Sequence, residues 1–141
     1  MIGIVVVTHA GLADEIRYAA ELILGPQSGV EAVSIDRDMS VEVAKEKLHQ
    51  AVALVGKDGD GTMILTDLFG GTPTNISVEL LQEGVVEIVT GVNLPMLIKG
   101  ISARVNQNLD ELAALLKDYG KEAIIRPVEL LRSRRLSDST D

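Results

Sequence analysis

The 141 residues of this chain, 46% hydrophobic and 24% charged, suffice for one compact domain with a single core. A net charge of −8 repels phosphate backbones, and one phenylalanine and two tyrosines offer no platform for base stacking, so we expect no nucleic-acid binding. Without cysteine, a signal peptide or a run of roughly 20 apolar residues, the chain is expected to be cytoplasmic and free of disulfides and thiolate metal sites.

The first half of the chain predicts two strands that alternate with two helices. Residues 2–7 form a β-branched run, which is typical of a strand buried on both faces of a parallel sheet. Over residues 12–24 apolar positions recur every three or four residues, which predicts an amphipathic helix. A strand at about 30–35 and a helix over 41–55, capped by Ser40, complete this half.

The second half continues the same alternation. A third buried strand over 62–66 ends at Asp67, and a helix follows in which Thr72 is the expected N-cap and Pro73 lies in the first turn. The helix that contains Thr72 and Pro73 is expected to continue to about Gln82, and a strand over 85–89 follows. After it we expect a short helix that ends near Gly100 and a helix over 109–119 that stops at Gly120. Residues 123–125 are expected to add a short edge strand.

This pattern predicts a doubly wound, three-layer α/β/α sandwich with a mainly parallel sheet. The expected strand order is the flavodoxin-like 2-1-3-4, with a short antiparallel strand at the C-terminal edge. We place the domain at residues 1–128. Residues 129–141 are polar and lack periodicity, so we expect them to form a flexible tail.

The candidate site lies at the ends of two strands that are neighbours in this order. In open α/β sheets, chemistry gathers beyond the carboxyl ends of the strands where strand order reverses. His9 follows the first strand and Asp67 follows the third, so their side chains are expected to meet there. Asp67 then accepts the proton of one ring nitrogen and leaves the other free as a nucleophile toward phosphorus.

A phosphoryl group on His9 needs donors for its oxygens. Gly70 and Gly71 lead into a helix start and offer backbone amides together with a positive helix end. The hydroxyls of Thr8 and Thr72 are candidates for the same oxygens, although threonines at strand and helix ends are equally often capping residues.

Other interpretations were weighed for these positions. A lone histidine after a strand is usually an ordinary loop residue, and only the matching Asp67 favours chemistry. His49 falls off the apolar face of its helix and is expected to be solvated, and two histidines so far apart make a metal site improbable. Asp36 and Asp38 are expected to be solvated or to make a docking contact, and the glycine-rich turns match no nucleotide-binding motif.

Three segments carry a resemblance to a known family: IVVVTHAGLADE (4–15), ILTDLFGGTPTN (64–75) and IVTGVNLPML (88–97). In this order and spacing the chain resembles, over about residues 1–126, the enzyme IIA component of the mannose family of bacterial phosphotransferase systems. The first segment is also similar to the phosphotransferase subunit of dihydroxyacetone kinase, which lacks the DLFGGTP pattern.

The resemblance implies a phosphotransferase with a phosphohistidine intermediate and without metal or cofactor. His9 would accept the phosphoryl group from phospho-HPr and pass it to a IIB component for sugar uptake, with Asp67 holding the ring. The indirect partners would be the membrane components IIC and IID. The resemblance also implies a homodimer in which the C-terminal edge strand is exchanged.

Two features depart from many family members. Thr72 and Thr74 stand where a serine and an aromatic residue are common, and no room remains for a fused IIB domain, so we expect a separate IIB chain. Two other functions stay open: a regulatory phosphohistidine sensor of a partial phosphotransferase system, and a small nucleotide- or flavin-binding module.

Overall fold

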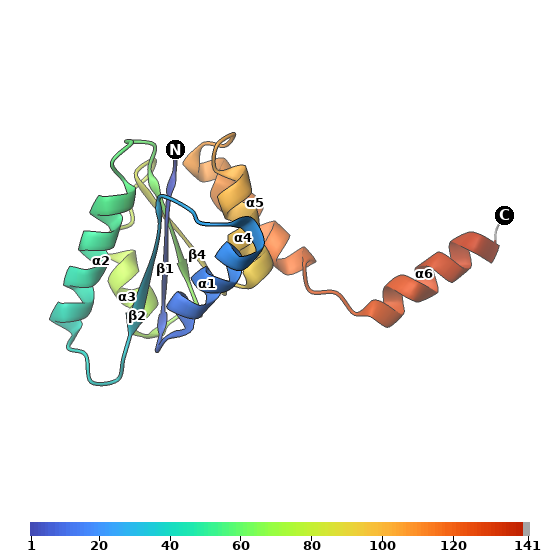
Figure 1. The fold of residues 1–141 in the computed structure, drawn as a ribbon, viewed down its shortest axis with the longest axis horizontal. Helices are drawn as coiled ribbons and strands as arrows, with labels where there is room; N and C mark the ends of the chain where they lie inside the picture. The colour runs from blue at the N-terminus through green and yellow to red at the C-terminus, as the bar shows by residue number, and fades with distance from the viewer. Residues whose placement is uncertain (140–141) are drawn as a thin grey trace.

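Four parallel strands form a single sheet in the order β2-β1-β3-β4 in the computed structural model, which describes residues 1–139 (Figure 1). The strands are β1 (Gly3–His9), β2 (Val30–Ile35), β3 (Thr62–Thr66) and β4 (Val86–Thr90). The helices are α1 (Leu12–Leu24), α2 (Val41–Val55), α3 (Gly71–Val78), α4 (Leu94–Ala103), α5 (Leu109–Glu122) and α6 (Pro127–Ser139). The predicted α/β sandwich and its strand order are confirmed.

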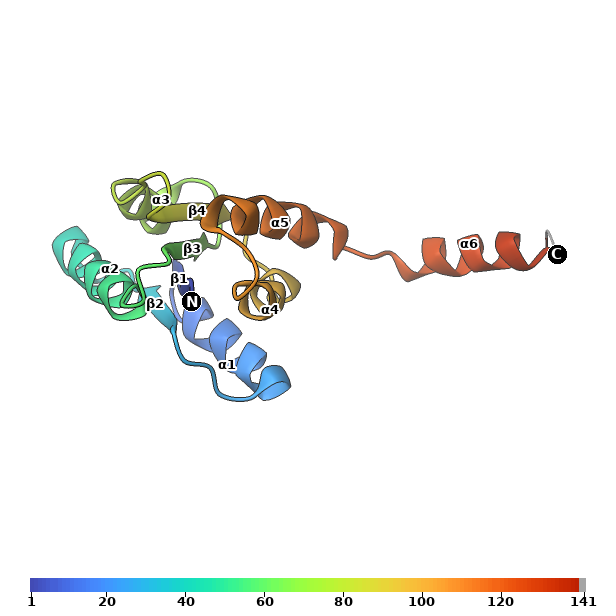
Figure 2. The same cartoon turned by 90° about the horizontal axis from the view of Figure 1, so that it is seen from above.

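Helices cover both faces of the sheet (Figure 2). Ile4 and Val6 of β1 pack into a core that α1, α4 and α5 close, whereas Val5 and Val7 pack into a second core under α2 and α3. Successive side chains of a strand point to opposite faces, so burial on both sides requires the continuous apolar run seen in the sequence.

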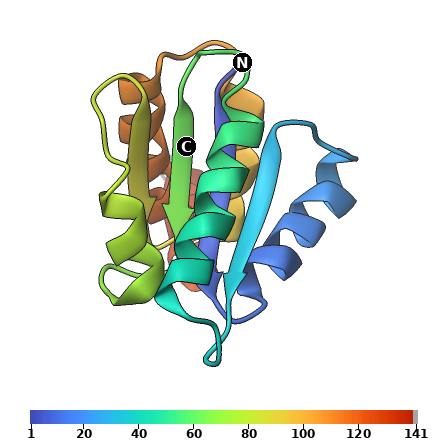
Figure 3. The same cartoon turned by 90° about the vertical axis from the view of Figure 1, so that its left-hand side faces the viewer.

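All four strands run in the same direction, so their carboxyl ends meet at one edge of the sheet (Figure 3). In the pairing of β1 with β3, Val7 lies opposite Thr66, and β1 continues for two more residues to His9. The first residue after β3 is Asp67. The central pair of strands therefore delivers a histidine and an aspartate to the same place.

The start of α3 differs from the expectation. The N-cap is Gly70 and the first helical residue is Gly71, so Thr72 already lies inside the helix and is not the cap. Gly70 and Gly71 have φ angles of 104° and 76°, a region that glycine enters without the cost that a Cβ imposes. The helix ends at Val78 rather than near Gln82, because the chain then turns back and Gln82 bridges to Val86.

The region after α4 also differs. α5 continues through Gly120 to Glu122, because Gly120 gives room for Met96: a Cβ at this position would lie 2.6 Å from the Met96 Cε atom. Residues 123–125 form no strand in the described chain, and the predicted antiparallel edge strand is absent from it. Ile124 is 80% exposed, and a strand needs a neighbouring strand edge that these residues do not reach in one chain.

The C-terminal segment Pro127–Ser139 forms the helix α6, whereas the sequence led us to expect no regular structure there. α6 extends away from the sandwich (Figure 1), and its side chains from Pro127 to Arg135 are exposed. Glutamate, leucine and arginine favour helices without any apolar face, so a lack of periodicity does not prevent one. The flexibility of the tail stays a prediction. Every described helix is too short or too polar to span a bilayer.

Candidate functional site

His9 and Asp67 are in direct contact, as the strand order predicts. The Nδ1 atom of the His9 ring lies 2.8 Å from Oδ2 of Asp67, and the His9 main-chain N–H donates to the same oxygen over 2.9 Å. The other carboxylate oxygen, Oδ1, accepts the N–H of Leu68 over 3.0 Å. One carboxylate thus binds the end of β1 and the loop that follows β3.

These hydrogen bonds determine which ring nitrogen is free. Burial by itself raises the pKa of the Asp67 carboxyl, but the hydrogen bonds from the His9 main chain and ring outweigh it and hold the pKa below its usual range. An ionised carboxylate only accepts hydrogen bonds, so the proton of the neutral ring lies on Nδ1. Nε2 is left with its lone pair available.

Nε2 faces the beginning of α3. A Cβ built on Gly71 would lie 2.9 Å from Nε2 and 3.0 Å from Cε1 of His9, so the ring sits directly against this glycine. The His9 side chain is 49% exposed, whereas that of Asp67 is 11% exposed. The ring is therefore half-exposed at the surface, while the carboxylate that contacts it is shielded.

The other two candidate residues flank Gly71: Gly70 is the N-cap of α3, and Thr72 is its second residue. No side chain caps the N-terminus of α3, so the first amides of the helix keep their donor capacity. A helix N-terminus with free amides and a positive dipole end attracts an anion. The arrangement at this end of the sheet suits a negatively charged group bound to Nε2.

Thr8 has a different place. Its side chain is fully buried, and its hydroxyl oxygen accepts the N–H of Ala13 over 2.7 Å and lies 3.3 Å from the carbonyl oxygen of Ala10. These contacts give Thr8 the capping role that is common for threonine at a strand end. Thr8 holds the start of α1 directly behind His9.

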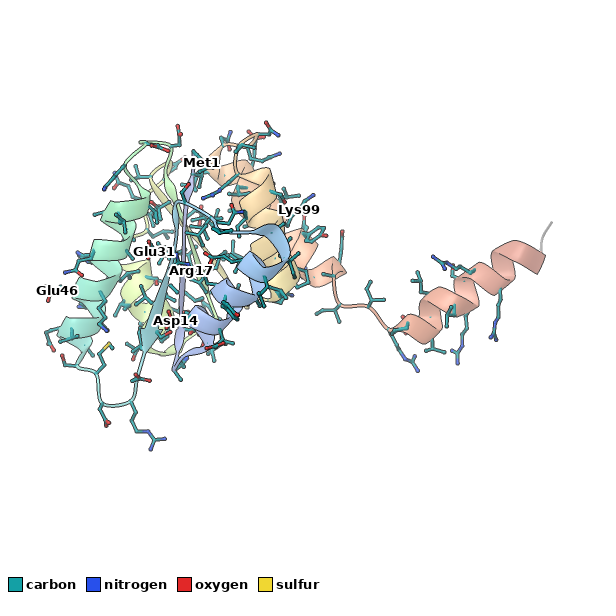
Figure 4. The ribbon with its side chains drawn as sticks, viewed as in Figure 1. Met1, Asp14, Arg17, Glu31, Glu46 and Lys99 are labelled. Carbon is teal, nitrogen blue, oxygen red and sulfur yellow. The ribbon has the colours of Figure 1, made fainter. Side chains whose placement is uncertain are left out.

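Charged groups on the neighbouring elements fasten α1 beside the site. Asp14, in the first turn of α1, accepts a hydrogen bond from Ser34 of β2 over 2.7 Å, and Arg17 pairs with Glu21 of α1 and with Glu31 of β2. Figure 4 labels Asp14, Arg17 and Glu31. His49 is exposed on α2. Asp36 and Asp38 are exposed in the loop after β2.

Three features of the site escaped the sequence analysis. Ala10 has a φ of 52°, a left-handed conformation that an alanine does not predict. Its N–H donates to the carbonyl oxygen of Ile35. Phe69 is 86% exposed beside the glycines. The hydroxyls of Thr66 and Thr74 are hydrogen-bonded to each other beneath the loop. The only feature of the sequence that pointed to this bond was the threonine at position 74, where many family members have an aromatic residue.

The chain is similar to known proteins over most of its length. A family model described as PTS system fructose IIA component matches residues 3–117. The mannose-specific EIIAB component of Escherichia coli K12 is 31% identical to this chain over 91% of the chain's length. The matched region is only 41% of the length of that relative. The fructose-specific EIIA component of Bacillus subtilis is 27% identical over 87% of this chain and 84% of its own length.

The fold also matches a solved structure. The crystal structure of the phosphotransferase system component EIIA from Streptococcus agalactiae superposes with a TM-score of 0.82 at 29% identity. The match covers 92% of this chain and 99% of that one.

The lowered pKa of Asp67 predicts an acid-dependent contribution to stability. Ionised Asp67 stabilises the fold at pH values above the unfolded pKa of about 4, and this stabilisation is lost as the pH falls through the lower folded value. The free energies of unfolding of the protein and of Asp67→Asn, measured in urea, should differ most between pH 5 and 7 and converge as the pH falls through the lowered folded pKa of Asp67. The exposed Asp38→Asn serves as the control, and an Asp67→Asn difference that stays constant with pH would contradict the assignment.

Proposed function

The chain belongs to the family of PTS system fructose IIA components, the EIIA proteins of the sugar phosphotransferase system, and on that premise we propose that it carries a phosphoryl group on Nε2 of His9. The observation that supports this proposal most directly is the contact of Nδ1 with Asp67, which leaves Nε2 free and directed at an anion-binding helix start.

The transfer follows from the tautomer of the ring. The lone pair of Nε2 attacks the phosphorus of a phosphohistidine on the donor, the donor's P–N bond breaks, and the leaving imidazole keeps its electron pair. The proton on Nδ1 stays in place, so the phosphorylated ring becomes cationic beside the carboxylate of Asp67. Passing the group to an acceptor reverses these steps.

The oxygens of the bound phosphoryl group are held by the first amides of α3, from Gly70 to Thr72. No side chain caps these amides, so they remain available as donors and would need little reorganisation during transfer. Thr72 adds a hydroxyl, and Thr8 acts from behind by fixing the end of β1. His9 is the nucleophile and Asp67 orients it.

The partners in this proposal are phospho-HPr as donor and a separate IIB component as acceptor, with the membrane components IIC and IID served indirectly through IIB. The surface around His9 suits protein docking, because Leu12, Leu68 and Phe69 are exposed apolar side chains at its rim. A protein donor must bring its own phosphohistidine to the half-exposed His9 ring. Exposed apolar side chains around that ring would be buried when the surface of the donor docks there.

Labelling with phosphorylated HPr tests the function. The protein should take up one acid-labile phosphoryl group per chain, His9→Ala should take up none, and Asp67→Ala should react at least about a hundredfold more slowly because its ring is no longer oriented. His49→Ala is the matched control and should be labelled like the unaltered protein. Equal labelling of His9→Ala would remove the proposal.

The amide cradle is tested by a matched pair of glycines. Gly71 and Gly59 both have φ of 76°, so alanine enters the left-handed region at either position, but only at Gly71 does the new Cβ meet the His9 ring. Gly71→Ala should slow labelling by about a hundredfold, whereas Gly59→Ala should be labelled normally. Equal rates in the two variants would show that the approach of Gly71 to Nε2 is unimportant.

We also propose that the protein is a homodimer in which residues 123–125 add an antiparallel strand to β4 of the partner. β4 lies at the edge of the sheet beside a groove of about 660 Å³, which is lined by Val89, Gly91, Ala113, Gly120 and Ile124 among others. Ile124 and Ile125 are 80% and 58% exposed in one chain, and pairing with a second chain would bury both the isoleucines and the strand edge.

Sedimentation of the protein tests the dimer. The chain of 15.1 kDa should sediment with twice that mass, and replacing Ile124 and Ile125 by serine should shift it toward the monomer. The control is the serine replacement of Leu22 and Ile23, which are exposed to a similar degree on α1 and should leave the mass unchanged. A monomeric mass for the unaltered protein would contradict the proposal.

A further inference from the structure

Two buried hydroxyls lie beneath the loop that connects β3 to α3. Thr66 is the last residue of β3 and is fully buried, and Thr74 lies in the first half of α3 and is 3% exposed. Their Oγ1 atoms are 2.9 Å apart, and the Thr74 hydroxyl donates to the carbonyl oxygen of Leu68 over 2.6 Å. Strand, loop and helix are thus joined at one point.

The direction of these bonds follows from the number of protons. The hydroxyl of Thr74 has one proton, and the Leu68 carbonyl, which only accepts, takes it. The hydroxyl of Thr66 must therefore donate to Thr74. The result is a relay from Thr66 through Thr74 to Leu68, in which each buried donor is satisfied.

The loop has few other means of staying in place. Phe69 is 86% exposed and Leu68 is 49% exposed, so neither side chain anchors the loop in a core. Gly70 and Gly71 follow, and glycine is the residue with the most backbone freedom. The Leu68 residue, however, is held on both sides: its N–H is bound by Asp67 and its carbonyl by Thr74.

We propose that Thr74, supported by Thr66, is a further positioning residue of the site. By fixing the Leu68 carbonyl it determines how the Asp67 carboxylate and the Gly70 and Gly71 amides are presented to His9. This inference rests on the proposed phosphoryl transfer, and it adds a residue that touches neither His9 nor the transferred group but sets the geometry of both sides of the reaction.

Ser77 provides a matched control within the same helix. Its side chain is fully buried, and its hydroxyl donates to the carbonyl of Pro73 over 2.6 Å, a bond internal to α3 that has no link to the loop. Thr74→Val and Ser77→Ala each remove one buried hydroxyl from α3, and both variants keep the remaining carbon atoms of the side chain. Only the first disconnects Leu68.

The decisive measurement is steady-state phosphoryl transfer from phosphorylated HPr through the protein to a saturating amount of a IIB component, at varied concentration of phosphorylated HPr. Thr74→Val should lower kcat about tenfold or more with little change in KM, because donor docking is intact while the amides and the carboxylate are misplaced. Thr74→Ser should restore the rate, and Ser77→Ala should behave like the unaltered protein. Thr66→Val, which keeps the bond from Thr74 to Leu68, should show a smaller loss than Thr74→Val and serves if Thr74→Val does not fold.

A second readout separates this inference from the proposed function. Backbone ¹⁵N order parameters for Leu68–Gly71 should fall in Thr74→Val and stay unchanged in Ser77→Ala, whether or not any phosphoryl group is transferred. Absence of labelling in the unaltered protein would overturn the function. A Thr74→Val loop as ordered as the original, an unchanged kcat in that variant, or an equal loss in Ser77→Ala would overturn the positioning role.

Discussion

The parallel pairing of β1 with β3 is the constraint on which the site depends. His9 and Asp67 are 58 residues apart and meet only because Val7 lies opposite Thr66. A slip of one residue would move His9 by about 3.3 Å and exchange the faces of the strand. Alternate side chains of β1 fill two different cores, so such a slip would disrupt both, and packing far from the site thereby fixes its geometry.

The carboxylate of Asp67 uses the proximity that this register creates to orient the His9 ring. Its Oδ2 atom binds the main chain and the ring of His9, and its Oδ1 atom binds Leu68. The orientation of the ring and the orientation of the loop are therefore coupled through one rigid group. A lowered pKa keeps that group ionised, which holds the ring proton on Nδ1 and leaves Nε2 available.

The sequence predicts the parts of this structure that depend on local periodicity and on strand ends. Buried runs identify the strands, and the carboxyl ends of β1 and β3 identify His9 and Asp67 as a contacting pair. The start of α3, the passage of α5 through Gly120 and the helix over Pro127–Ser139 were not predicted, because they depend on glycine conformation, on room for Met96 and on helix propensity without an apolar face. The bond from Thr74 to Leu68 depends on tertiary contact, which spacing does not encode.

The two segments that form the site differ in burial: β1 is buried, whereas the loop after β3 is exposed. His9 stands at the end of a strand buried on both faces, whereas the loop beside it presents Phe69 and two glycines to the surface. In the proposed transfer a partner protein approaches this loop, and side chains packed over the loop would cover Nε2. Hydrogen bonds from beneath are the remaining way to hold the loop, which gives a physical reason for two buried threonines under an exposed loop.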